Sequence, residues 1–125
     1  MAQAVAPLEG AVLDLGSEPP VINHSDLHRE QFLFVWGRLS GWRDFGDAVA
    51  GPPGWDAAAL AYFWGGPCLP DFLAGYGVSA QASATLEDQS RLLAVPLAFH
   101  RASRAQSEAQ LSEAAQYLRG ALSER

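Results

Sequence analysis

The sequence HSDLHREQ at residues 24–31, followed by DFGD at residues 44–47, decides how this chain folds and what it can do. Asp26 lies inside the first segment, Gln31 ends it, and Asp44 opens the second. An acid on a loop can orient a hydroxyl group, and an amide with a second acid can hold a divalent metal ion. This pattern of residue types is therefore typical of a phosphoryl-transfer site.

The composition of the 125-residue chain bounds its fold and its partners. Apolar residues make up 49% of the chain, which excludes a disordered protein and suits one domain with a modest core. The chain has eight Arg, no Lys and a net charge of −6, so we expect no nucleic-acid partner. It has no signal-like N-terminus and no apolar run of about 18 residues, so we expect no membrane partner.

The cysteine content indicates a cytoplasmic location. Cys68 is the only cysteine, so an internal disulfide is excluded and a reducing compartment is expected. Cys68 lies in the turn sequence GGPCLP, where a packed or turn thiol is the favoured interpretation over a catalytic nucleophile.

The pattern of apolar and turn residues predicts a mainly α-helical domain with one small β-hairpin. Large β-forming residues at 32–36 and the returning segment 39–42 predict two strands, joined by a turn at Gly37 and Arg38. We expect helices over residues 3–14, 57–64, 70–76, 85–102 and 107–122.

Three residues are expected to shape these helices. Thr85, with Asp88 three residues later, resembles a capping box and marks the start of the long helix. Pro96 is expected to kink that helix or to divide it in two. Asp56 is expected either to cap the helix that follows it or to brace the neighbouring loop.

The hairpin predicts which side chains of the site meet. Gln31 opens the hairpin and Asp44 follows its second strand, so the tight turn brings both to the same end. Their oxygens can converge on Mg²⁺, which favours few carboxylate contacts, retained waters and substrate phosphates. Asp26, on the same edge, can orient a hydroxyl group or accept its proton.

The histidines of the loop leave an alternative open. We expect the ring of His24 to bond the backbone and hold the loop, and His28 to face solvent. A second interpretation is a metal-dependent hydrolase in which His24, Asp26 and His28 bind zinc or iron.

Three motifs, taken together, resemble the carboxy-terminal lobe of the aminoglycoside phosphotransferase and choline-kinase-like family, which shares the protein-kinase fold. The usual pattern of that family is HGDLHxxN, a short hairpin, IDFGDA and then GDPxxDLA. Here HSDLHREQFLF, LSGWRDFGDAVAG and PPGWDAAALA follow in the same order and at matching spacing, within residues 20–65. The helices that follow are compatible with such a lobe.

The resemblance implies a role for each matching residue. Asp26 matches the catalytic acid, Gln31 stands where a metal-binding Asn is usual, and Asp44 matches the metal-binding acid. His24 matches the supporting loop histidine, and Asp56 matches the buried acid that braces the loop. The implied cofactors are Mg²⁺ and ATP or GTP. The implied substrate is a small hydroxylated molecule, and the acidic balance of the chain suits a cationic one.

Several residues depart from the family pattern. Gln31 keeps the amide oxygen of Asn but is one methylene longer, which shifts or weakens metal coordination. Arg43 replaces an apolar residue, and we expect it to be buried and to pair with Asp44 in competition with metal. Pro52 replaces the usual Asp of GDP.

The resemblance also implies a domain organisation. We expect a single domain over residues 1–125, with catalytic loop 24–31, hairpin 32–43, metal segment 44–47 and helical part 56–123. The amino-terminal lobe, which supplies the glycine-rich loop and the phosphate-binding lysine, is expected to be absent from the chain. The partner is then an oligomer or a separate nucleotide lobe.

Two further functions stay open beside the hydrolase. One is an ATP-dependent phosphotransferase lobe, impaired or inactive by itself, because phosphoryl transfer depends on both lobes. The other is a non-catalytic, kinase-fold binding or interaction module.

Overall fold

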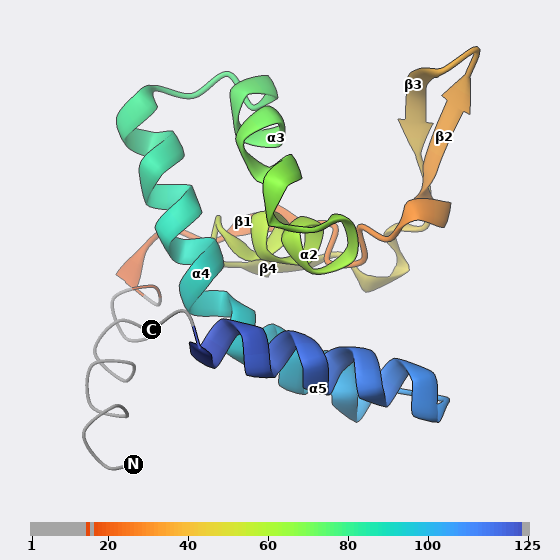
Figure 1. The fold of residues 1–125 in the computed structure, drawn as a ribbon. Helices are drawn as coiled ribbons and strands as arrows, with labels where there is room; N and C mark the ends of the chain where they lie inside the picture. Colours follow the sequence, from red (N-terminus) through yellow and green to blue (C-terminus); the bar gives the residue numbers. More distant parts are fainter. Residues whose placement is uncertain (1–14, 16, 124–125) are drawn as a thin grey trace.

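The computed structural model describes Leu15 and residues 17–123, so the helix expected over residues 3–14 lies outside the described residues. The fold is mainly α-helical with a small β-hairpin, as the sequence predicts, and it also has a second two-stranded antiparallel sheet (Figure 1). Its strands are β1 (Val21–Asn23), β2 (Phe32–Val35), β3 (Arg38–Trp42) and β4 (Val49–Gly51). Its helices are α2 (Trp55–Trp64), α3 (Leu69–Gly75), α4 (Ala80–Ser103) and α5 (Glu108–Ser123). Short 3₁₀ helices cover Arg29–Gln31, Phe45–Asp47 and Gly66–Cys68.

The pairing of β1 with β4 joins the two ends of the chain segment that contains both motifs. The two strands run antiparallel, with Val21 opposite Gly51 and Asn23 opposite Val49. Because β1 leads into residues 24–31 and β4 follows residues 44–47, this pairing ties the start of the first segment to the end of the second. The sequence did not predict β4.

The hairpin of β2 and β3 projects away from the helices (Figure 1). Its register pairs Phe32 with Trp42 and Val35 with Arg38. The turn lies one residue earlier than expected, because Trp36 and Gly37 both have positive φ, at 49° and 75°. This is the conformation of a type I′ turn, which matches the twist of the flanking strands. Trp36 is therefore a turn residue and not the end of a strand.

The main core lies between α2 and α4. Its buried residues are Leu15, Ala58, Ala59, Leu93 and Leu97. Alanines on α2 allow α4 to approach closely, and at Gly54, just before α2, a Cβ would lie only 2.5 Å from the Cβ of Gln89. The amide of Gly54 also donates to Gln89 Oε1 at 3.0 Å, so this contact fixes where α2 begins.

The long helix α4 begins earlier than predicted and is not divided. Its N-cap is Ser79, whose hydroxyl accepts from the amide of Ala82 at 3.2 Å. Thr85 lies inside the helix and donates to the carbonyl of Gln81, so it is not a cap. Pro96 lies within the helix, which bends so that its last turns run beside α5 (Figure 1). No helix among the described residues is long and apolar enough to cross a membrane.

Candidate phosphotransferase site

The carboxylate of Asp56 holds the start of the catalytic loop. Asp56 Oδ2 accepts from the amide of His24, and Oδ1 accepts from the amide of Ser25, both at 2.8 Å. Asp56 lies in the first turn of α2, and the N-cap of that helix is Gly54. Of the two expectations for Asp56, the structure therefore shows contacts with the loop and not a cap.

The ring of His24 joins the loop to the second segment. Its Nε2 lies 2.8 Å from the carbonyl oxygen of Arg43, and its Nδ1 lies 3.3 Å from the amide of Asp26. A carbonyl can only accept, so Nε2 carries the proton and Nδ1 accepts. The ring also packs edge-on against Phe45, with 4.6 Å between centroids. Both nitrogens of His24 are thus committed to backbone groups.

Ser25 has an unfavourable conformation beside Asp26. Its φ is 72°, its side chain is buried, and its hydroxyl has no hydrogen-bond partner. The family pattern has Gly at this position, where a positive φ carries no steric cost. Ser25 therefore retains a backbone conformation that suits glycine and adds an unsatisfied polar group to it.

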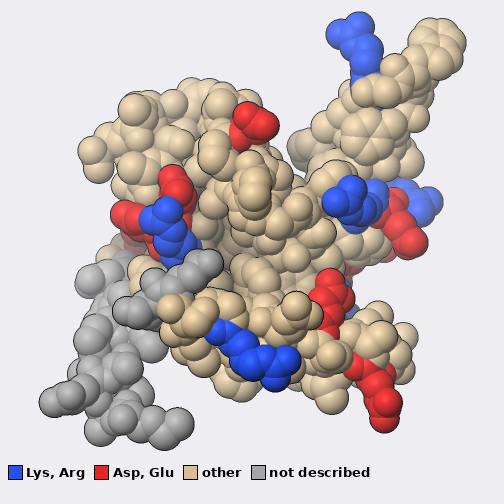
Figure 2. Space-filling model, viewed as in Figure 1, with Lys and Arg blue, Asp and Glu red and all other residues tan. Residues whose placement is uncertain are grey.

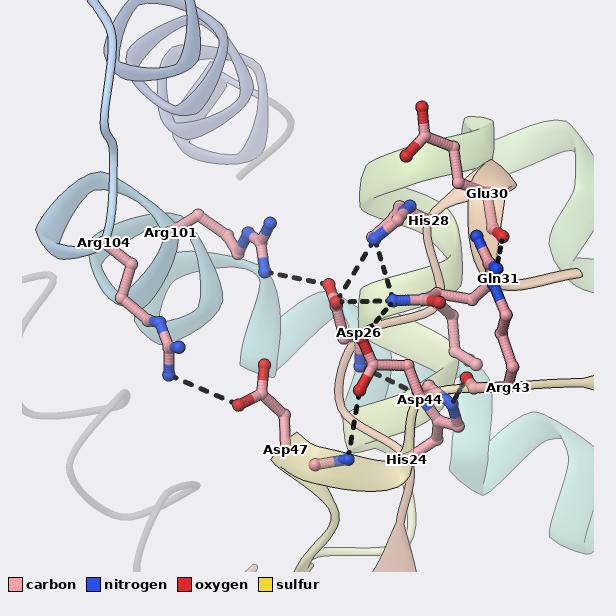
Figure 3. Close-up of polar contacts among 12 residues, drawn as sticks. His24, Asp26, His28, Glu30, Gln31, Arg43, Asp44, Asp47, Arg101 and Arg104 are labelled. Carbon is pink, nitrogen blue, oxygen red and sulfur yellow. Dashed lines mark hydrogen bonds and ion pairs between the residues drawn. The ribbon is translucent and has the colours of Figure 1, made fainter.

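Asp26, Gln31 and Asp44 meet at one point (Figure 3). Gln31 Nε2 donates to Asp26 Oδ2 at 3.2 Å and to Asp44 Oδ2 at 3.3 Å. Gln31 is buried at the start of the hairpin, and Asp44 follows β3 with a left-handed φ of 62°. The tight hairpin thus brings Gln31 and Asp44 together, as its turn predicts.

The donor set at this point fits a magnesium ion. The two carboxylate oxygens are hard ligands, and a half-turn of the amide group of Gln31 would exchange Nε2 for Oε1 between them. An amide oxygen and a carboxylate oxygen are the ligands that Gln31 and Asp44 would supply.

The alternative metal cluster does not form. No group of three or more His, Cys, Asp or Glu side chains within the described part of the chain is arranged to hold a metal ion. His24 turns both nitrogens to the backbone and so cannot join Asp26 and His28 as a third ligand. The structure therefore contradicts a zinc or iron site built from His24, Asp26 and His28.

Two neighbours of the site differ from expectation. Arg43 is exposed, and its Nε donates to the carbonyl of Glu30 at 3.3 Å, so it does not pair with Asp44. Arg43 directly follows β3, and its side chain bonds the backbone carbonyl of Glu30 rather than the carboxylate of Asp44. His28 does not simply face solvent, because its Nε2 lies 3.3 Å from Asp26 Oδ2 and 3.0 Å from Gln31 Nε2.

Arg101, near the end of α4, is a site residue that sequence reasoning missed. Its Nη1 lies 3.2 Å from Asp26 Oδ1, and its guanidinium carbon lies 4.6 Å from the ring centroid of Phe63. The two ends of this ion pair are 75 residues apart. In the sequence, Arg101 has no signal beyond its favourable place near a helix C-terminus.

A cavity of about 430 Å³ opens beside Asp26. The catalytic loop lines one side of it, and α2, the end of α4 and the start of α5 line the others. Tyr62 on this lining has a raised pKa, first because of burial and then because of the negative charge of Glu113, while Arg101 opposes the rise. A second cavity of about 510 Å³, between α2, α4 and α5, contains no residue of the two motifs.

The comparison with known proteins agrees with the geometry. A family model described as "Phosphotransferase enzyme family" matches residues 1–93, which include both motifs and the whole of α2. No curated protein matches the chain. On the strength of that family match, which covers most of its length, the chain belongs to the phosphotransferase enzyme family.

Proposed function

We propose that this protein transfers the terminal phosphoryl group of ATP or GTP to a hydroxyl group of a small molecule. The observation that carries the proposal is the convergence of Asp26 and Asp44 on the amide group of Gln31. An acid for the acceptor hydroxyl and a metal-binding pair thus lie within one group of contacts, which is the arrangement that phosphoryl transfer needs.

Each residue has a chemical role in this proposal. The acceptor oxygen forms a bond to the terminal phosphorus while the bond to the nucleoside diphosphate oxygen breaks, and Asp26 accepts the hydroxyl proton. Gln31 and Asp44 would hold Mg²⁺, which would neutralise phosphate charge. Asp56 and His24 keep the loop in place through their bonds to its backbone.

The cavity beside Asp26 suits a small cationic acceptor. Within the described residues, Asp26 is paired with Arg101, and Asp47 is paired with Arg104. Glu30 and Glu113 also line the cavity, and neither forms an ion pair with a described residue. The net negative charge that they leave favours an acceptor that carries both a hydroxyl group and a positive charge.

The nucleotide phosphates need a second contact surface. The 125 residues contain no lysine, so a phosphate-binding lysine has to come from elsewhere. Large exposed apolar residues line the projecting hairpin, at Leu33, Phe34, Val35, Trp36, Leu39 and Trp42. On the face seen in Figure 2, the charged side chains of this projection lie toward its tip and at its base. We assign it as the docking surface for a nucleotide-binding lobe or a second copy, with the described residues as one lobe.

The cytoplasm is the proposed location of this activity. Cys68 is the one cysteine of the sequence, so its thiol has no cysteine to pair with within the chain. Burial raises the pKa of this thiol above the usual range. A thiol in its protonated form reacts slowly and needs no disulfide partner, which suits a reducing compartment.

A second candidate is a non-catalytic kinase-fold module. One observation favours it: the amide nitrogen of Gln31, and not the oxygen, points at Asp26 and Asp44. In this orientation the amide donates to both carboxylates and satisfies them without a metal ion.

Calorimetric titration with Mg-ATP separates the two candidates. We expect the wild-type chain to bind Mg-ATP weakly, because it has no phosphate-binding lysine, Asp44→Ala to abolish that binding, and Asp71→Ala to leave it unchanged. Asp71 is an exposed acid on α3, so this control removes the same charge away from the site. A wild-type chain that fails to bind Mg-ATP would overturn the catalytic proposal and favour the module.

A further inference from the structure

Asp26 is held by contacts on both of its carboxylate oxygens. Oδ2 accepts from Gln31 Nε2 on the side of the metal segment, and Oδ1 accepts from Arg101 Nη1 on the side of α4 (Figure 3). Within the described residues, Arg101 is the one side chain in hydrogen-bond contact with Oδ1. The direction of Oδ1 therefore depends on Arg101.

Arg101 is well placed to fix that direction. Its side chain is only 24% exposed, and its guanidinium group lies against the face of Phe63. Phe63 packs edge-on against His28 of the catalytic loop, with 5.7 Å between ring centroids. A guanidinium group that is stacked on an aromatic ring and bonded to a carboxylate has little rotational freedom left.

The contact also lies at the boundary of the acceptor cavity. Asp26 and Arg101 both line it, so an acceptor hydroxyl that reaches Oδ1 arrives beside the guanidinium group. A carboxylate oxygen has two lone pairs, so Oδ1 can accept from Arg101 and from the acceptor hydroxyl together. Arg101 thus leaves room for the substrate while it orients the oxygen.

We propose that Arg101 is a positioning residue that aims Oδ1 of Asp26 into the acceptor cavity, an inference that rests on the phosphotransferase function proposed above. Arg101 acts through Asp26 and does not itself contact the transferred phosphoryl group. Without it, the carboxylate keeps its bond to Gln31 but loses its orientation on the cavity side.

Arg104, the residue that directly follows the last residue of α4, provides a matched control. It lines the same cavity, but its side chain is 57% exposed and its Nη1 lies 3.6 Å from Asp47 Oδ1. An exposed ion pair of this kind contributes little to structure. Replacing Arg104 removes a neighbouring arginine that lines the same cavity but leaves the contact of Arg101 with Asp26 intact.

The side-chain amide signals of Gln31 in NMR spectra report the orientation of Asp26 without any need for activity. We expect Arg101→Gln to shift both amide proton signals, Arg101→Lys to return them toward their wild-type positions, and Arg104→Gln to leave them in place. Circular dichroism would verify that each variant is folded. Unchanged signals in Arg101→Gln, or equal shifts in Arg104→Gln, would overturn the proposal.

A kinetic measurement separates positioning from binding. In a phosphoryl-transfer assay we expect Arg101→Gln to lower kcat by about ten- to a hundredfold, with KM little changed, because a misplaced catalytic group slows the chemical step. A change in KM alone would overturn the positioning role. If the wild-type chain transfers no phosphate, the proposed function fails, while the Gln31 signals still decide whether Arg101 orients Asp26.

Discussion

The catalytic loop and the hairpin that follows it reverse the usual distribution of polar and apolar side chains. Residues 23–31 bury polar groups, at Asn23, His24, Ser25 and Gln31. Residues 33–42 instead expose large apolar ones, including Trp36, which is 98% exposed. Buried polar groups and large exposed apolar patches are the two departures from normal burial that carry information about function.

The two regions differ in how far the described residues themselves provide partners for these side chains. In the loop, Asn23 Nδ2 donates to the carbonyl oxygens of Val21 and Pro52, and Asp56 accepts from two loop amides. The hairpin has only two strands, and a two-stranded hairpin is marginal in water unless something packs on it. The loop is therefore organised from within the described residues, whereas the apolar side chains of the hairpin are left exposed, and we propose that a surface outside the described residues covers these side chains.

The largest expected effect comes from removing the brace of the loop. Asp56→Ala leaves the amides of His24 and Ser25 without an acceptor, so we expect the free energy of unfolding to fall by about 3 kcal/mol in urea denaturation. Asp56→Asn keeps one acceptor oxygen and should lose less. A change below about 0.5 kcal/mol in Asp56→Ala would show that the loop is held by other contacts.

We expect substitutions at the exposed apolar residues of the hairpin to act mainly on association with a partner rather than on folding stability. Replacing Phe34 and Trp36 together by Ser removes two exposed aromatic side chains, so we expect self-association, or docking of a nucleotide lobe, to weaken about tenfold. Sedimentation equilibrium measures this change directly. Leu122→Ser, which alters an exposed apolar residue on α5, is the control. Equal association of the double variant and wild type would remove the hairpin as the docking surface.

The local parts of the fold and site could be predicted from the sequence. Large β-forming residues around Gly37 predicted the hairpin, and its return predicted that Gln31 and Asp44 would lie together. The amphipathic pattern located α5, whose last residue lies within one position of the expected end. These predictions are confirmed because each feature depends on residues that are close together in the chain.

The missed features depend on contacts between distant residues or on small local preferences. Pro96 predicted a kink in α4, but no local pattern predicts that the end of this helix brings Arg101 to Asp26, 75 residues away in the chain. The start of α4 was misplaced because Ser79 is as good a cap as Thr85, and the alanine-rich sequence after Ser79 extends the helix. Arg43 was expected to be buried because the family pattern has an apolar residue at its position, but its side chain is exposed and bonds the carbonyl of Glu30.

Ser25 offers a smaller change in the opposite direction. We expect Ser25→Gly to raise the free energy of unfolding by about 1 kcal/mol, because relief of the positive φ and of the unpaired hydroxyl outweighs the greater freedom of unfolded glycine. Calorimetry should show the melting temperature rise by about 3–6 °C. Ser25→Ala removes the hydroxyl alone and so separates the two contributions. A loss of stability in Ser25→Gly would mean that the hydroxyl has a partner in solution.

The smallest expected effect tests whether the turn of the hairpin is shaped for folding or for contact. Asn-Gly is the favoured pair in a type I′ turn, and Asn tolerates the left-handed conformation of Trp36 better than Trp does. We therefore expect Trp36→Asn to raise the free energy of unfolding by about 0.5 kcal/mol, measured in urea, while it weakens docking. A fall in stability would show that the indole already packs on the protein in solution. A rise together with weaker docking would mean that Trp36 serves the partner at the expense of the turn.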